Sequence, residues 1–243
     1  NNPKAGGQVN EFTPLHSAAS SGHVHIIEYL VENIEGDINP SANIGTVLHY
    51  AAMKGHLNVV SFYTKILPDP NPTFKAMTPL HFAADKGHLP VVQHICNLLE
   101  DKNPKDSMGF TPLHAAAQSG QIEIVKYLVQ HVKEKHPKCS NLAYSESYNT
   151  KSGVEYGQAT PLDYAKISGH SEIVKLFQRV DEIERMKKQR KGRKANKHVK
   201  TSTVVQGNNE DYDIDSVLQS LGVSDEVEKS KKKPKKKNKK SRP

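Results

Sequence analysis

The histidines and cysteines are the side chains of this sequence with the greatest capacity for chemistry. The chain of 243 residues has 13 His and 2 Cys, side chains that ligate transition metals and transfer protons near neutral pH. Eight His recur at two fixed positions of a repeated pattern: His16, His49, His81 and His114 after Leu, and His23, His56, His88 and His170 after Gly. A catalytic or metal site needs one convergent cluster, so this regular recurrence favours a structural role.

Three other side chains, His131, His136 and Cys139, are close enough in sequence to approach one metal ion. They supply three ligands, whereas a closed structural zinc site takes four. The sequence also lacks a glycine-rich phosphate loop, a nucleophile elbow and a His-Glu-x-x-His motif. Cys96 follows Ile95 in an apolar segment, which favours a buried thiol over a nucleophile. We therefore expect no enzymatic activity, no catalytic residue, no metal and no cofactor.

The recurring His belong to a unit that is repeated five times. Its Thr-Pro-Leu-His signature begins at intervals of 33, 32, 33 and 49 residues, at Thr13, Thr46, Thr78, Thr111 and Thr160. A Gly follows nine residues later in every copy: Gly22, Gly55, Gly87, Gly120 and Gly169. After each Gly, apolar residues return with the i, i+1, i+4 spacing of one helix face, as in Ile26, Ile27 and Leu30.

Each copy predicts two helices joined by a turn. Thr at the N-cap accepts hydrogen bonds from unpaired backbone N–H groups, and Pro at the first helical position loses no bond. The following Ala pair allows close helix packing, and Gly adopts the left-handed conformation that ends the helix. One unit cannot bury its own apolar face, whereas stacked units bury a continuous core. The sequence therefore predicts an all-α solenoid of about five helix-turn-helix repeats.

The pattern resembles the ankyrin repeat, a unit of about 33 residues with a turn, two helices and a Thr-Pro-Leu-His signature. The resemblance covers residues 10–180, with repeats starting near 10, 43, 75, 108 and 157 and an insertion at about 133–157 that is either functional or disordered. Val47 replaces Pro, Asp163 replaces His, and Gln121 replaces the His after Gly. The resemblance implies that the first His column hydrogen-bonds to backbone across the hairpin. It also implies that partners bind the hairpin tips and the inner helix face.

The two ends of the repeat array differ. The last helix ends in the polar pair Gln178-Arg179, which a capping repeat requires. The first copy has no polar cap, and the sequence starts at Asn1. We therefore expect further repeats ahead of it in the full protein.

Variable positions in the repeats predict a partly apolar groove with Lys and Asp at its centre. The predicted partner contacts are Phe12, Met53, Lys54, Phe74, Met77, Asp85, Lys86, Met108, Phe110, Gln118 and Ile167. The alternative is that Phe12, Phe110 and the Met residues pack between adjacent hairpins. Lys and Arg are sparse on this surface, so we do not expect the repeats themselves to hold nucleic acid.

Basic residues are concentrated at the C-terminal end. Residues 1–180 contain 15 Lys and Arg against 16 Asp and Glu, whereas residues 181–243 contain 19 against 10 in blocks of alternating sign. Such blocks stay solvated, so we expect residues 181–243 to be largely disordered. Two clusters resemble nuclear-import signals: Lys187, Lys188, Arg190, Lys191, Arg193 and Lys194, and Lys231, Lys232, Lys233, Lys235, Lys236 and Lys237. The alternatives are phosphate contacts with RNA or DNA, an anionic membrane surface, and a plain solvated tail.

Between these clusters, apolar residues at helical spacing predict a short docking helix that folds on a partner. Its residues Ile214, Leu218, Leu221 and Val223 also resemble a leucine-rich nuclear-export signal. The alternatives are another docking helix and intramolecular pairing with the basic clusters.

These features predict a non-enzymatic intracellular protein, cytoplasmic or nuclear or both. It is expected to act as a monomeric scaffold or adaptor for protein partners, with import and export receptors among the candidates. The alternative is an RNA- or ribosome-associated regulatory factor that binds mainly through its Lys-rich tail. No run of 18 or more apolar residues occurs, so no membrane-spanning helix is expected.

Overall fold

The computed structural model describes residues 12–33, 35–139 and 159–197, with side chains up to residue 189. The helices are α1 (Pro14–Ser20), α2 (Val24–Asn33), α3 (Val47–Lys54), α4 (Leu57–Ile66), α5 (Pro79–Lys86), α6 (Leu89–Leu98), α7 (Pro112–Gln118), α8 (Ile122–His131), α9 (Pro161–Ile167) and α10 (Ser171–Lys197). In this part of the chain the only extended pairing is three isolated antiparallel bridges between repeats. The chain divides after Glu182 into two units, and the repeats lie in the first.

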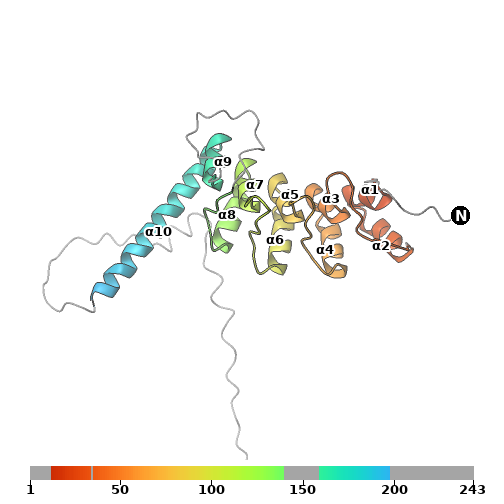
Figure 1. Ribbon diagram of the computed structural model, residues 1–243, viewed down its shortest axis with the longest axis horizontal. Coiled ribbons are helices and arrows are strands. Elements are labelled where there is room, and N and C mark those ends of the chain that lie inside the picture. The colour runs from red at the N-terminus through yellow and green to blue at the C-terminus, as the bar shows by residue number, and fades with distance from the viewer. Residues whose placement is uncertain (1–11, 34, 140–158, 198–243) are drawn as a thin grey trace, which may run out of the picture. The chain divides into compact units, whose positions relative to one another are not determined.

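Each repeat contributes a short inner helix and a longer outer helix. The inner helices α1, α3, α5, α7 and α9 lie side by side in one layer, and the outer helices α2, α4, α6 and α8 form a second layer (Figure 1). This arrangement confirms the predicted all-α stack of helix pairs.

The helix boundaries follow the capping residues. Every inner helix begins after a Thr in extended conformation, at Thr13, Thr46, Thr78, Thr111 and Thr160. The Gly nine residues later has a φ between 75° and 84° in every repeat. A residue with a Cβ is strained in this left-handed region, so Gly is the residue that turns the inner helix into the outer one.

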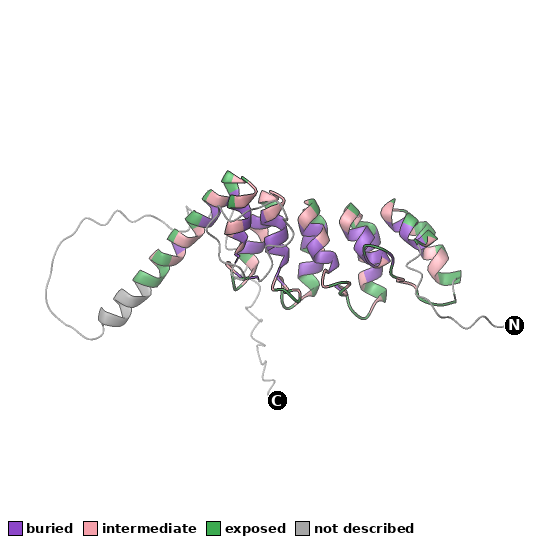
Figure 2. Ribbon diagram, turned by 45° about the horizontal axis from the view of Figure 1, so that its top comes forward, coloured by how far each residue is buried: buried purple, intermediate pink, exposed green. Residues whose placement is uncertain are grey.

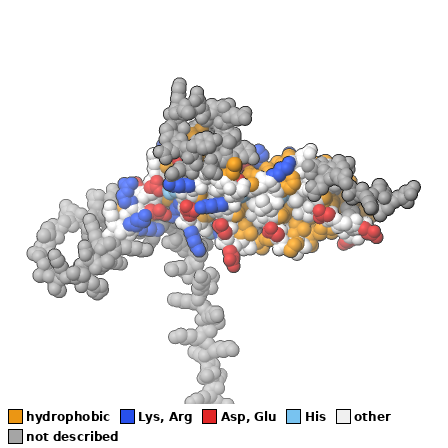
Figure 3. All heavy atoms as spheres, in the orientation of Figure 1, with side chains coloured by type: hydrophobic (Ala, Val, Ile, Leu, Met, Phe, Trp, Pro, Cys, Tyr) orange, Lys and Arg blue, Asp and Glu red, His pale blue; other side chains and the backbone are white. Residues whose placement is uncertain are grey.

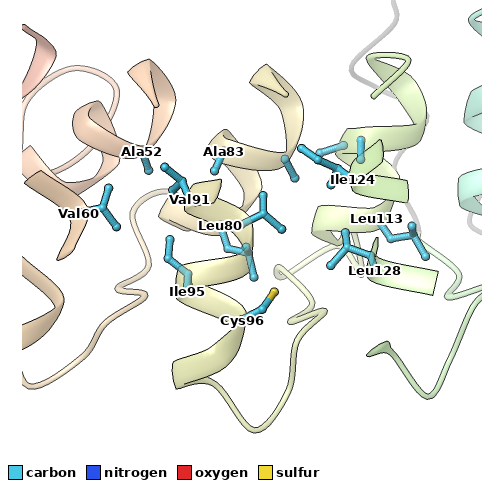
Figure 4. Packing of buried hydrophobic residues seen from close by; sticks show 14 of the residues in the cluster. Ala52, Val60, Leu80, Ala83, Val91, Ile95, Cys96, Leu113, Ile124 and Leu128 are labelled. Carbon is cyan, nitrogen blue, oxygen red and sulfur yellow. The ribbon is translucent and has the colours of Figure 1, made fainter. Parts of the chain in front are cut away.

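The core lies between the two layers and between neighbouring repeats (Figure 2). Ala52 and Ala83 of the inner helices are fully buried, and their small side chains allow neighbouring inner helices to approach closely. Figure 4 shows Leu80 of the inner helix α5 near Ile95 of α6, and Leu113 of the inner helix α7 near Leu128 of α8. Each such aliphatic side chain contributes about 1.5–3 kcal/mol by leaving water, and a single repeat has too few of them to fold alone.

The two ends of the insertion between the fourth and fifth repeats are joined by a backbone hydrogen bond. The N–H of Cys139 donates to the carbonyl oxygen of Ala159 over 3.0 Å, and residues 140–158 between them lie outside the described part of the chain. Helix α10 continues to Lys197, beyond the boundary predicted at residue 180. None of the described helices combines the length and the apolar character needed to cross a bilayer.

Candidate functional site

The His residues of the first column lock the start of each inner helix. The backbone N–H of Thr78 donates to Nδ1 of His81 over 3.3 Å, and the Thr78 hydroxyl lies 2.9 Å from the same nitrogen. The same pair of contacts joins Thr13 to His16, Thr46 to His49, and Thr111 to His114. Because Nδ1 accepts from the Thr N–H, the ring proton lies on Nε2.

The Nε2 atoms then reach the next repeat. His49 donates to the carbonyl oxygen of Met77, His81 to that of Phe110 and His114 to that of Ala159, over 3.2, 3.3 and 3.2 Å. Burial lowers the pKa of each of these three imidazoles to about 4, so they are neutral near pH 7. For these three His the structure confirms the expected hydrogen bond to backbone across the hairpin, whereas Nε2 of His16 is buried without a hydrogen-bond partner among the described residues.

The second column joins neighbouring inter-helix turns. His56, His88 and His170 donate through Nε2 to the carbonyl oxygens of Ser20, Met53 and Gln118 of the preceding repeat, over 2.8, 3.0 and 2.9 Å. Gln121, which replaces His in the fourth repeat, makes the same bond to the carbonyl oxygen of Asp85 through its side-chain amide. The replacement is therefore structurally conservative.

These contacts repeat from one helix pair to the next, as the 33-residue period predicts. A family model described as "Ankyrin repeats (3 copies)" matches residues 1–63 and 62–141, more than half of the chain. The chain belongs to the ankyrin-repeat family. A comparison with curated proteins gave no match. The fifth ankyrin repeat lies beyond the matched residues, but Thr160 and Gly169 place its helices in the same way.

The side chains considered for a metal site engage separate partners. His131 Nδ1 donates to the carbonyl oxygen of Tyr127 over 2.7 Å, and His136 Nε2 lies 2.7 Å from a carboxylate oxygen of Asp181. Cys139 is buried, with its Sγ 3.6 Å from the Tyr164 hydroxyl. Within the described residues, no three His, Cys, Asp or Glu are grouped to hold a metal ion.

The other cysteine is buried as well. Burial raises the pKa of Cys96 to about 12, so the reactive thiolate form is suppressed. Ankyrin repeats are in general interaction domains.

Most of the predicted partner contacts reach the surface. Phe12, Lys54, Lys86 and Met108 are exposed. Six others are partly buried: Met53, Phe74, Met77, Asp85, Gln118 and Ile167. We use the term inner surface for two sets of exposed residues: those in the hairpins that precede the inner helices, and those at the C-terminal ends of the inner helices. Apolar side chains are visible at the surface of the first three ankyrin repeats (Figure 3).

Phe110 does not belong to the inner surface, contrary to the sequence-based prediction. It is 5% exposed, and its ring stacks on His114 at 5.2 Å and meets the edge of Tyr164 at 5.5 Å between centroids. The carboxylate of Asp106 accepts the N–H groups of both Met108 and Phe110 at 2.8 Å, which holds the hairpin so that Phe110 turns inward. For this residue the alternative, packing between hairpins, is correct.

Two contributors to the inner surface were missed from the sequence. Ile44 is exposed in the hairpin before α3, and Lys75 lies with its Nζ 5.2 Å from the centroid of the Phe74 ring. A comparison of the residues two and three positions before each Thr would have found both. With these residues, each of the first four ankyrin repeats has a large apolar side chain at or near its hairpin: Phe12, Ile44, Phe74 and Met108.

A separate hollow of about 570 Å³ lies between the loops before α5 and α7. Asp69, Glu100, Asp101 and Asp106 line it, together with Lys105. It was not predicted from the sequence, and it contains none of the predicted contacts.

Only part of the predicted tail sites lies within the described residues. Lys187 and Lys188 are exposed on α10, which also carries Arg190, Lys191, Arg193 and Lys194. The second basic cluster (Lys231, Lys232, Lys233, Lys235, Lys236 and Lys237) and the docking residues (Ile214, Leu218, Leu221 and Val223) lie outside the described residues.

Proposed function

We propose that this ankyrin-repeat chain is a non-enzymatic adaptor that binds a segment of a partner protein on its inner surface. The observation that carries the proposal is the exposure of large apolar side chains at successive hairpins, above all Phe12, Ile44 and Met108. Exposed apolar side chains clustered on one face are typical of interaction sites, where aromatic residues and Met are enriched.

The charged residues of the inner surface indicate which residues the partner segment contains. Lys54 and Lys75 are exposed, while the ammonium of Lys86 lies 2.9 Å from the Asp85 carboxylate. Lys75 lies over the Phe74 ring and Lys54 ends the inner helix α3, and neither has a carboxylate partner among the described side chains. We expect the partner segment to combine apolar residues with Asp or Glu, because opposite charges at the rim of an interface speed association and fix its register.

The alternative function places the main contact in the Lys-rich tail, with RNA or a ribosome as partner. It is favoured by the ten Lys and Arg of residues 229–243, among which no acid occurs. The import-like clusters and the export-like helix are equally compatible with passage between nucleus and cytoplasm. These tail functions remain proposals.

The test compares surfaces of equal exposure. Partners captured from extract by the full chain are identified by mass spectrometry, purified and titrated against a Phe12→Ser/Met108→Ser double variant. Removal of two apolar contacts is expected to weaken binding roughly tenfold or more. Leu98→Ser is the matched control, since Leu98 is 50% exposed on the outer helix α6 and should leave affinity unchanged.

Salt separates the two functions. Binding through the Lys blocks to phosphates should fall by roughly a hundredfold or more between 50 and 200 mM salt, whereas binding to the inner surface should change far less. Unchanged affinity in the double variant, together with the steep salt dependence, would overturn the adaptor proposal in favour of its rival.

A further inference from the structure

The inner surface carries positive charge beside its apolar side chains. Lys54 and Lys75 are exposed, and neither has a carboxylate partner among the described side chains. The carboxylate of Asp85, by contrast, lies 2.9 Å from the Lys86 ammonium and accepts a hydrogen bond from the Ser119 hydroxyl of the next repeat. A ligand of this surface is therefore complementary to it when it offers apolar side chains together with carboxylates.

The chain itself contains a segment of this chemistry in its tail. Residues 201–228 hold seven Asp and Glu and no Lys or Arg. Within them, Ile214, Leu218 and Leu221 are spaced i, i+4 and i+7, as on one face of a helix. We call residues 210–226 the acidic segment, which lies outside the described residues. Its sequence meets both requirements of the inner surface, apolar side chains and carboxylates.

The tether is long enough for the acidic segment to reach the repeats of its own chain. Helix α10 continues from Glu182 to Lys197, about 22 Å at 1.5 Å per residue. Residues 198–209 follow, and they can extend to about 40 Å. The acidic segment can therefore return to the last repeats whichever way the end of α10 points. Adjacent helices pack about 8–10 Å apart, so the hairpins before α7 and α5 are within its reach.

We infer that the acidic segment binds the inner surface of its own chain and competes there with the partner segment. In this arrangement its apolar face packs against Met108 and the Phe74 ring, and its carboxylates pair with Lys75. The inference rests on the proposed function, because it assigns a second ligand to the same surface. Tethering gives the acidic segment an effective concentration of about millimolar, so even a weak site is occupied. The tail thus keeps the surface covered until a tighter ligand displaces it.

Other arrangements within the chain match less well. Residues 1–11 contain Val9 as their only large apolar side chain, with one acid against one base. The insertion at 140–158 has two acids against Lys151, and a hydrogen bond joins the residues at its two ends. The basic clusters of the tail offer charge alone, so pairing with them leaves the apolar face of the acidic segment in water.

A labelled peptide of residues 210–226 is the probe, titrated against the full chain by fluorescence anisotropy. The wild-type chain is compared with a Leu218→Ser/Leu221→Ser double variant, in which the changed residues lie outside the buried core of the repeats. The double variant is expected to bind the peptide at least roughly tenfold more tightly, because the wild-type chain supplies its own competitor. Equal affinity of the two chains, or no binding to the double variant, would contradict the inference.

Further changes in the double-variant chain map the contact. Met108→Ser is expected to weaken peptide binding roughly fivefold or more, whereas Leu98→Ser, at a similarly exposed site on the outer helix α6, should leave it unchanged. Lys75→Glu should also weaken binding, and a peptide with Asp213→Lys and Asp215→Lys should recover affinity for that variant. A peptide that binds the Met108→Ser chain with undiminished affinity lies elsewhere, which would overturn the inference.

The captured protein partner distinguishes this inference from the proposed function. The partner is expected to bind the double variant more tightly than the wild-type chain, because its competitor has been removed. If partner binding depends on Met108 but the peptide does not bind, the inference fails and the proposed function stands. If neither ligand depends on Met108, both fail.

Sedimentation of the wild-type chain tests whether the contact is intramolecular. A monomer is expected at all concentrations, with and without the Leu218→Ser/Leu221→Ser change. A concentration-dependent dimer that this change dissolves would overturn the inference and place the acidic segment on a second copy.

Discussion

The imidazole of His88 lies over Gly55 of the preceding repeat, in the space that a Cβ on Gly55 would occupy. Its Nε2–H meanwhile donates to the carbonyl oxygen of Met53 over 3.0 Å. Gly55 also has a φ of 79°, so two independent requirements exclude a side chain at this position. Each inter-helix turn therefore reverses the backbone and also leaves the space in which a His ring of the next repeat packs.

The two requirements at this position can be measured separately. Gly169 has a φ of 78° but has nothing within 4 Å of a built Cβ, so Gly169→Ala tests the backbone alone and is expected to cost about 1–2 kcal/mol. Gly55→Ala carries the same backbone cost and also displaces the His88 ring, so its loss should be larger by about 1 kcal/mol or more. Urea unfolding of both variants measures the difference, and equal losses would show that His88 moves aside freely.

Acid should destabilise the repeats well above the titration range of carboxylates. The pKa of His49, His81 and His114 is about 4 in the folded chain, against 6.5 for an ordinary His. Below pH 6.5 these three imidazoles bind protons in the unfolded chain, whereas in the folded chain they stay neutral until about pH 4. The three His therefore make their full contribution to the free energy of unfolding above pH 7. This contribution falls as the pH falls from about 6.5 to about 4, by up to about 1.4 kcal/mol per pH unit for each His.

Urea midpoints measured at intervals from pH 7.5 to pH 4.5 check this slope. His81→Gln retains an amide donor but cannot be protonated, so it should reduce the three-His slope by about a third, whatever its effect on stability at pH 7.5. A free energy of unfolding that stays flat between pH 7 and pH 5 would contradict neutral burial of the three imidazoles.

Phe110 and Met108 should respond in opposite ways to truncation. Phe110→Ala removes a ring that stacks on His114 and makes a T-shaped contact with Tyr164, and it is expected to lower the free energy of unfolding by about 3–5 kcal/mol. Met108 is 46% exposed, so Met108→Ala should cost less than about 1 kcal/mol while weakening partner binding. Thermal unfolding and partner titration of the two variants give the comparison, and a stable Phe110→Ala protein would restore Phe110 to the inner surface.

The hairpin before α5 offers a stabilising substitution. Lys75 and Ala76 form its tip with φ of 46° and 71°, a region that costs a residue with a Cβ about 1–2 kcal/mol. Ala76→Gly should raise the free energy of unfolding by about 1 kcal/mol after the added freedom of the unfolded chain is counted. The reverse change at the hairpin before α7, Gly109→Ala, should destabilise, because its φ is 79° and its Cβ would lie 2.7 Å from the carbonyl oxygen of Lys138.

The two substitutions thus form a pair of opposite sign, measured by chemical unfolding under the same conditions. Loss of stability in Ala76→Gly would mean that the tip is not strained.

Helix boundaries, turns and the number of repeats were determined by the sequence alone. Thr78 caps α5 and bonds to His81 three residues away, and Gly87 ends the same helix with a φ of 84°. These interactions operate within about one turn of chain, so identical short strings produce identical local structure wherever they occur. The departure at Gln121 was visible in the sequence, but its replacement bond to Asp85 was seen only in the folded chain.

Which apolar side chains are exposed was decided by the tertiary structure. Met108 and Phe110 are two apolar residues of one hairpin, yet Met108 is exposed and Phe110 is buried against Tyr164, which belongs to the next repeat and comes after the insertion. Ile26 has the residue type and spacing of Ile124, but their burial differs because a repeat precedes α8 and none precedes α2 among the described residues. Local patterns determine the shape of one repeat, whereas burial depends on atoms contributed by its neighbours, and no spacing within a single repeat records whether those neighbours are present.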